Sequence, residues 1–139
     1  MSANRIPKKP DRCERGGIYI CNLPTQTVTE RTDGKVHHRD GIELHGPRPC
    51  VVISSGAFKC GQGRGLIVAP TTDGAEYNVA TFEQVPHTWV RVISKGEARY
   101  VQIEQLRYID RSRCKAKTGE LIECDMKLVE SKLRQLLFQ

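Results

Sequence analysis

Arg48 stands between two prolines, in the segment 46–49 (GPRP). Pro49 disfavours helical backbone at Arg48 and keeps it extended, and Pro47 fixes its own φ angle. A guanidinium on so stiff a backbone loses little entropy when it binds a ligand, and its planar fork matches two oxygens of a phosphate. The residue types in this segment therefore suggest chemistry on a phosphate group.

Two short apolar runs lie on either side of a glycine-containing connection. Residues 49–54 and 65–69 are rich in β-branched side chains and predict two buried strands, joined by a loop over residues 55–65. If the strands pair antiparallel about the middle of this loop, Val51 lies opposite Ala69.

Continuing the same register places Arg48 opposite Thr72, at the open end of the strand pair. Thr72 offers a hydroxyl, and Asp73 and Gly74 offer nearby backbone N–H groups. These groups together suit a phosphate ligand. The alternative is that Arg48 forms a salt bridge at a strand end and Thr72 closes a turn. The pattern alone favours this alternative.

The other elements are shorter and less regular. Further strands are expected over residues 18–21, 81–85, 89–93, 99–103 and 106–109, and Asp33-Gly34 suits a small hairpin in the long polar connection 22–47. Apolar residues at helical spacing predict an amphipathic helix over residues 123–137. We therefore expect a mainly β, α+β domain: a small twisted barrel with a C-terminal helix packed on it.

The charge of the chain is unbalanced. The formal net charge is +6, with basic residues concentrated in residues 1–15 and 107–117. A basic balance favours a polyanionic partner such as nucleic acid, an acidic protein or a membrane surface, although a solvated face explains each segment equally well. We expect residues 1–14 to form a basic arm and residues 15–139 to form one domain.

Metal ligands and export signals are not apparent in the sequence. The six cysteines include no CxxC pair and no Cys/His cluster with zinc spacing, so we expect no metal and no cofactor. The apolar runs are far shorter than a bilayer span, and the N-terminus lacks the apolar region of a signal peptide. These features predict a cytoplasmic protein with reduced thiols and no membrane partner.

Four segments, in order, resemble the blocks of the MazF/PemK toxins. They are residues 15–19 (RGGIY), residues 46–54 (GPRPCVVIS), residues 67–72 (IVAPTT) and residues 104–111 (EQLRYIDR). With the C-terminal helix, the resemblance spans about residues 15–137. A single RP pair would mean little, but the ordered set is specific.

The resemblance implies an SH3-like barrel of the CcdB/PemK type that forms a homodimer and cuts single-stranded RNA without a metal. The ribose 2′-hydroxyl attacks the adjacent phosphate, which leaves a cyclic phosphate and a 5′-hydroxyl. Arg48 matches the catalytic arginine of the family and Thr72 matches its catalytic threonine. The implied protein partner is an antitoxin whose acidic segment blocks the RNA groove.

The resemblance also suggests helper residues. Glu104 is a candidate catalytic helper or base-reading acceptor, and so is His45, three residues before Arg48. Thr71 lies beside the catalytic threonine and is expected to contact RNA. Gln105 and Arg107 could contact RNA or stabilise the barrel.

Two other functions remain open on the same fold. The CcdB gyrase poisons share the barrel but inhibit through protein contacts, and a non-catalytic nucleic-acid-binding barrel is a third reading. The connection 22–47 is longer than in the family and borders the expected RNA groove. The RNA sequence preference therefore cannot be inherited from relatives.

Overall fold

The computed structural model describes residues 13–25, 27–31, 36–40, 44–55, 64–75 and 85–138. The elements follow one another along the chain as β1 (Gly17–Leu23), β2 (Thr27–Arg31), β3 (Val36–Asp40), β4 (Gly46–Val52), β5 (Gly65–Thr72), β6 (Trp89–Ser94), β7 (Glu97–Gln102), the 3-10 turn η3 (Ile103–Gln105), β8 (Arg107–Asp110), the 3-10 turn η4 (Arg111–Arg113), β9 (Cys114–Glu120) and α1 (Glu123–Phe138).

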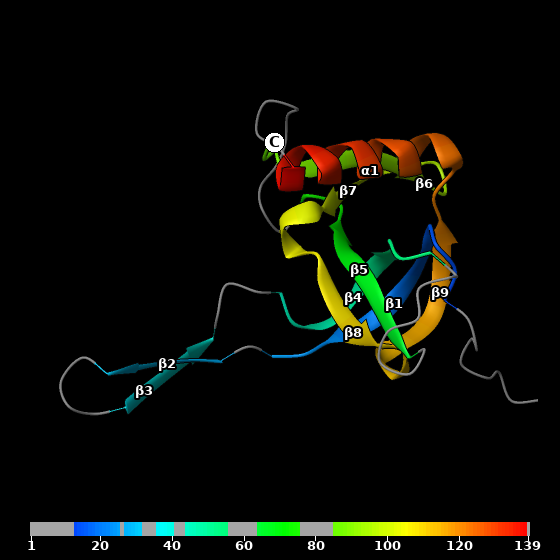
Figure 1. Ribbon diagram of the computed structural model, residues 1–139. Coiled ribbons are helices and arrows are strands. Elements are labelled where there is room, and N and C mark those ends of the chain that lie inside the picture. Colours follow the sequence, from blue (N-terminus) through cyan, green and yellow to red (C-terminus); the bar gives the residue numbers. More distant parts are fainter. Residues whose placement is uncertain are drawn as a thin grey trace, which may run out of the picture.

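A seven-stranded antiparallel sheet makes up the body of the molecule. Its strands follow the order β6-β7-β5-β4-β1-β9, and β8 also pairs with β5. β2 and β3 form a separate two-stranded ribbon that projects away from this body (Figure 1). The mainly β architecture with one C-terminal helix is therefore confirmed.

The sheet is bent because β5 pairs with different strands along its length. Its first half pairs with β8 and its last two residues pair with β7, while β4 lies along its middle. At the ends of the path, a Cβ atom on Gly119 would lie 2.8 Å from Ser94 Oγ. Since β9 passes this close to the end of β6, a side chain at position 119 would force Ser94 to move, and the sheet curls toward a barrel.

The pairing of β4 with β5 follows the expected register. Val51 lies opposite Ala69, and the Ile53 N–H donates a hydrogen bond of 2.8 Å to the Ile67 carbonyl. The open end of this pair is therefore the end that carries Arg48, as predicted.

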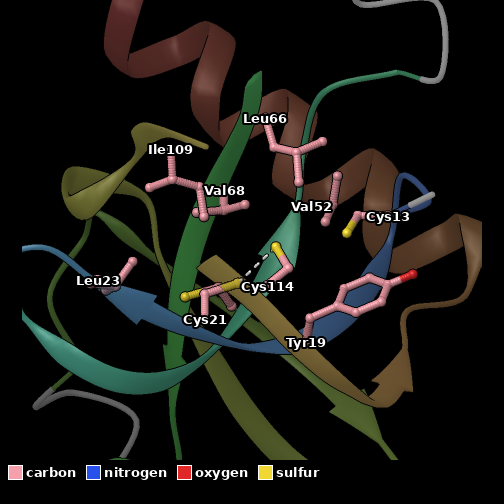
Figure 2. Packing of buried hydrophobic residues seen from close by; sticks show 10 residues of the cluster. Cys13, Tyr19, Cys21, Leu23, Val52, Leu66, Val68, Ile109 and Cys114 are labelled. Atoms are coloured by element: carbon pink, nitrogen blue, oxygen red, sulfur yellow. Dashed lines mark hydrogen bonds between the residues drawn. The ribbon is translucent and has the colours of Figure 1, made fainter. Parts of the chain in front are cut away.

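Two apolar clusters fill the fold. The first includes Cys21, Cys50 and Val68, and Figure 2 shows its labelled side chains gathered between the strands. The second includes Ala69 and residues of α1, with Met126 and Val129 buried. Because neighbouring residues of a strand point to opposite faces, β5 contributes to both clusters. α1 packs against β6 (Figure 1), and its Met126 and Val129 belong to the second cluster.

Some expectations need correction. No strand was expected over residues 114–120, which overlap the basic segment 107–117, but they form β9 beside β1. Cys13, near the end of the expected arm, is buried in the first cluster. Polar side chains hid the strand, because an edge strand buries few of its residues. Residues 1–12 lie outside the described residues, and so does all of the strand expected over 81–85 except Val85.

The hairpin in the long connection is also present. Thr27 pairs with Asp40 and Arg31 pairs with Val36, so two paired strands flank the Asp33-Gly34 position. Residues 32–35, where the turn was expected, lie outside the described residues.

Candidate active site

An open cleft of about 370 Å³ lies at the end of β4 and β5 where Arg48 was predicted to meet Thr72. Its lining combines residues from the start of β4, the end of β5 and the start of β7. The lining residues are His45, Pro47, Arg48, Pro49, Thr71, Thr72, Asp73 and Arg99. The structure therefore brings together four of the residues predicted from the sequence.

Arg48 is half-buried on β4, and a local turn holds it. Gly46 has a φ of +78°, a conformation that favours glycine, and it redirects the chain between His45 and Pro47. The Arg48 Nε then donates to the His45 carbonyl at 3.4 Å. The prolines restrict the backbone and this bond orients the guanidinium, so the side chain is positioned before any ligand binds.

Thr72 is buried at the end of β5, and its hydroxyl helps to build the turn that follows. Its Oγ1 accepts a hydrogen bond from the Gly74 N–H at 3.0 Å. Asp73 Oδ1 accepts from the Ala75 N–H at 2.9 Å in the same turn. The turn-closing role proposed from the pattern is thus present, and the same threonine also lines the cleft.

Thr71 connects the cleft to two other strands. Its Oγ1 donates to the Pro49 carbonyl at 3.2 Å and accepts from Arg99 Nε at 3.2 Å. Arg99 was not predicted from the sequence. Its strand was expected, but only the pairing of β7 with the end of β5 brings its guanidinium to the cleft. No local signal could have found it.

The charges in the cleft are predominantly positive. Two guanidinium groups, Arg48 and Arg99, share the lining with one carboxylate, Asp73. Within the described part of the chain, no salt bridge engages Arg99. The cleft is therefore suited to an anionic ligand.

Glu104 is not among the residues that line the cleft. Its carboxylate accepts hydrogen bonds from Thr88 Oγ1 at 2.6 Å and from Trp89 Nε1 at 2.8 Å. These bonds hold η3 against the start of β6. The structure thus gives Glu104 a positioning task within the fold. Trp89 itself is buried.

Gln105 and Arg107 also lie outside the cleft lining, but they support its border. Gln105 Oε1 accepts from the Leu44 N–H at 3.0 Å and from Arg107 Nη2 at 3.0 Å. Leu44 directly precedes His45, so this pair ties η3 and β8 to the segment that enters the cleft. Of the two alternatives stated above, these contacts support the stabilising one.

The described residues contain no group of three or more His, Cys, Asp or Glu side chains arranged to hold a metal ion. None of the described helices has both the length and the apolar character needed to cross a bilayer.

Comparison with known families identifies the chain. A model of the family described as PemK-like, MazF-like toxin of type II toxin-antitoxin system matches residues 14–137. The chain belongs to this family. The match includes every residue of the cleft and extends almost to the end of α1, so the toxin is a member over nearly its whole length. A sequence search of curated proteins finds no match to the toxin.

Solved structures with a similar fold include other toxins. MazF from Deinococcus radiodurans is 22% identical, with a TM-score of 0.63, and the match covers 96% of this chain and 100% of that one. An endoribonuclease from Mycobacterial species is 15% identical, with a TM-score of 0.57 over 96% of this chain and 95% of that one. A third, an endoribonuclease in complex with its cognate antitoxin from Mycobacterial species, is 18% identical, with a TM-score of 0.58 over 89% and 93% of the two chains. At these identities the likeness confirms the fold.

Proposed function

We propose that this toxin is a metal-independent endoribonuclease that cuts single-stranded RNA in the cleft between β4 and β5. The observation that carries the proposal is that Arg48 and Thr72 line one cleft, with Arg48 held by two prolines and a hydrogen bond. Two of the similar structures are themselves described as endoribonucleases. The RNA substrate would lie along the basic cleft.

The reaction transfers the phosphoryl group within the RNA strand. The ribose 2′-oxygen loses its proton and forms a bond to the adjacent phosphorus, while the bond from phosphorus to the 5′-oxygen breaks. The departing 5′-oxygen takes up a proton. The products are a 2′,3′-cyclic phosphate and a 5′-hydroxyl. Negative charge gathers on the non-bridging oxygens of the phosphate in the transition state.

Arg48 is suited to stabilise this charge. Its guanidinium can donate two parallel hydrogen bonds to the non-bridging oxygens, and it stays protonated, so it is a charge stabiliser and no base. Losing one pre-positioned donor of this kind typically costs roughly 3–4 kcal/mol of transition-state stabilisation. The partial burial of Arg48 strengthens the interaction because water screens it less.

Thr72 supplies a second donor. The Gly74 N–H donates to Thr72 Oγ1, which fixes the oxygen in place, and a threonine hydroxyl can donate as well as accept. Thr72 would hold one phosphate oxygen while Arg48 holds the others. His45 and Thr71 border the same space and would contact the flanking nucleotides.

The protein partner we propose is an antitoxin with an acidic segment. Two of the similar structures are toxin-antitoxin complexes, one of them a MazE-MazF complex from Deinococcus radiodurans. The net charge of +6 and the basic cleft would attract acidic side chains as well as phosphates. An antitoxin segment bound there would compete with RNA. We also propose that the toxin is a homodimer, which light scattering at micromolar concentration would test.

The test of the proposed function is cleavage of a long single-stranded RNA in excess EDTA. We expect cutting at defined positions, with 5′-hydroxyl ends that ligate only after phosphorylation by a kinase. The 3′ ends should resist extension until a phosphatase that opens cyclic phosphates removes the blocking group. If no RNA is cut at any protein concentration, the ribonuclease assignment is wrong, and a gyrase-supercoiling assay would then test the alternative that the barrel acts through protein contacts.

A further inference from the structure

Arg99 enters the cleft from the side opposite Arg48. β5 lies between β4 and β7 in the sheet, so the cleft at the end of β5 receives Arg48 from one neighbouring strand and Arg99 from the other. Arg99 is half-buried and lies outside the four segments that carry the family resemblance. Its place in the cleft was therefore not an expectation of that resemblance.

A chain of hydrogen bonds fixes the Arg99 side chain. Its Nε donates to Thr71 Oγ1 at 3.2 Å, and the Thr71 hydroxyl donates to the Pro49 carbonyl at 3.2 Å. The chain crosses from β7 through β5 to β4 and ends on the residue next to Arg48. Since Nε is engaged by Thr71, the two Nη groups form the free edge of the guanidinium fork.

The charge of Arg99 is not balanced by a carboxylate in the described residues. The nearest ladder pair is Thr72 with Tyr100, so Asp73 follows β5 close to Arg99. The Asp73 carboxylate instead accepts from the Ala75 backbone, and no salt bridge joins it to Arg99. A half-buried, oriented guanidinium on an open cleft is arranged to bind an anion from outside.

We propose that Arg99 binds a second phosphate of the RNA, next to the phosphate that Arg48 holds. This inference rests on the proposed function and extends it. Two guanidinium groups on either side of β5 would hold consecutive parts of a single strand, and the fixed separation between them would select an extended backbone. Arg99 thereby sets the register of the RNA, while the reacting phosphate stays with Arg48 and Thr72.

Binding of an uncleavable RNA tests the proposal. The probe is a single-stranded 2′-O-methyl RNA of mixed sequence, which lacks the attacking hydroxyl, and its Kd is measured over a series of salt concentrations. For Arg99→Gln we expect the slope of log K against log salt to fall in magnitude by about 0.7, the value for one phosphate contact on a single strand. The Kd at low salt should rise by about tenfold.

Two further variants separate a phosphate contact from loss of charge or loss of fold. Arg91→Gln removes an equal charge from an exposed position on β6 outside the cleft lining, and its slope should match that of the wild type. Arg99→Lys keeps the charge and cannot reproduce the Nε bond to Thr71, and it should keep most of the slope. The proposal is wrong if Arg99→Gln has the wild-type slope. It is also wrong if the slope of Arg91→Gln falls by as much as the slope of Arg99→Gln.

Cleavage kinetics provide a second readout. Arg99→Gln should raise KM about tenfold and leave kcat within about threefold, because uniform binding is lost and the transition-state donors remain. A purely structural role would lower kcat and the melting temperature together, which would overturn the inference. Free inorganic phosphate, added as a competitor, should weaken RNA binding to wild type more than to Arg99→Gln.

The outcomes distinguish this inference from the proposed function. If the toxin binds 2′-O-methyl RNA with the expected Arg99 slope but cuts no RNA, the phosphate site stands and the ribonuclease assignment fails. If the toxin cuts RNA and Arg99→Gln matches wild type in slope and in KM, the inference about Arg99 fails and the ribonuclease assignment stands.

Discussion

The cleft and the thiol-rich core lie side by side on the same strands, yet their chemistry is opposite. Arg48 on β4 lies across from Cys21 on β1, and Cys21 lies across from Cys114 on β9. Three residues that lie across from one another on neighbouring strands are therefore a charged, half-buried arginine and two buried, uncharged cysteines. Cys50 is only two residues from Arg48 and is 0% exposed.

Burial accounts for the difference in charge. Cys21 Sγ and Cys114 Sγ are 3.3 Å apart in the first apolar cluster (Figure 2). A hydrogen bond with Cys13 lowers the pKa of Cys114, but the bond with Cys21 and desolvation outweigh it and raise this pKa to about 12. Water is excluded from these thiols, which favours their neutral form, whereas an open cleft lets a ligand reach the guanidinium of Arg48. The position of a side chain in the sheet thus decides which chemistry it can support.

The largest expected effect comes from removing the charge in the cleft. Arg48→Ala should lower kcat/KM for RNA by about a hundredfold to a thousandfold, because one pre-positioned donor is lost from the transition state. Its melting temperature should stay within a few degrees of wild type, since Arg48 is only half-buried. Cleavage of a fluorescent RNA measures kcat/KM, and thermal unfolding measures the melting temperature. Wild-type activity in this variant would remove Arg48 from the site.

A smaller effect is expected from adding polarity to the core. Cys114→Ser places a hydroxyl among apolar side chains and should lower the free energy of unfolding by about 1–3 kcal/mol. The matched control is Cys124→Ser, an exposed cysteine on α1, which should change that free energy by less than about 0.5 kcal/mol. Urea unfolding of both variants provides the measurement. Equal values would mean that the thiol cluster is not part of the packed core.

Thiol reactivity sharpens the comparison further. At about pH 8, iodoacetamide should alkylate Cys114 at least tenfold more slowly than Cys124, because the raised pKa and the burial of Cys114 keep it protonated and shielded. Raising the pH toward the pKa of about 12 should accelerate the Cys114 reaction. Peptide mass spectrometry after timed quenching gives both rates. Equal rates at both sites in native protein would contradict the proposed burial.

The smallest effect is expected at the end of β5 opposite the cleft. Asp110 faces Gly65 there, and hydrogen bonds from Ser112, together with the nearby Arg64, lower the pKa of Asp110. A carboxyl group whose pKa is lower in the folded state stabilises the protein when the pH is above its unfolded-state pKa. This contribution disappears as the pH falls through the folded-state pKa. The melting temperature of the wild type should therefore be slightly higher than that of Asp110→Asn at neutral pH. The two melting temperatures should converge below about pH 4. A difference that grew on acidification would have the wrong sign.

Local patterns were sufficient for most elements of the fold. Runs of β-branched residues predicted β4 and β5, helical spacing predicted α1, and the loop position predicted that Val51 pairs with Ala69. These features depend on residues close together in the chain, so the sequence carries them directly. β9 was missed because an edge strand with few buried side chains has no alternating apolar pattern.

The same distinction holds for the residues of the cleft: the sequence predicts the positions of some, and only the tertiary structure places the others. The sequence by itself determined the stiff Pro-Arg-Pro segment and, through a short-range strand register, the meeting of Arg48 with Thr72. Only the tertiary structure brought Arg99 into the cleft and turned Glu104 toward Trp89. Both placements depend on how β7 and η3 meet β5 and β6, and such long-range contacts are set by packing across the whole sheet.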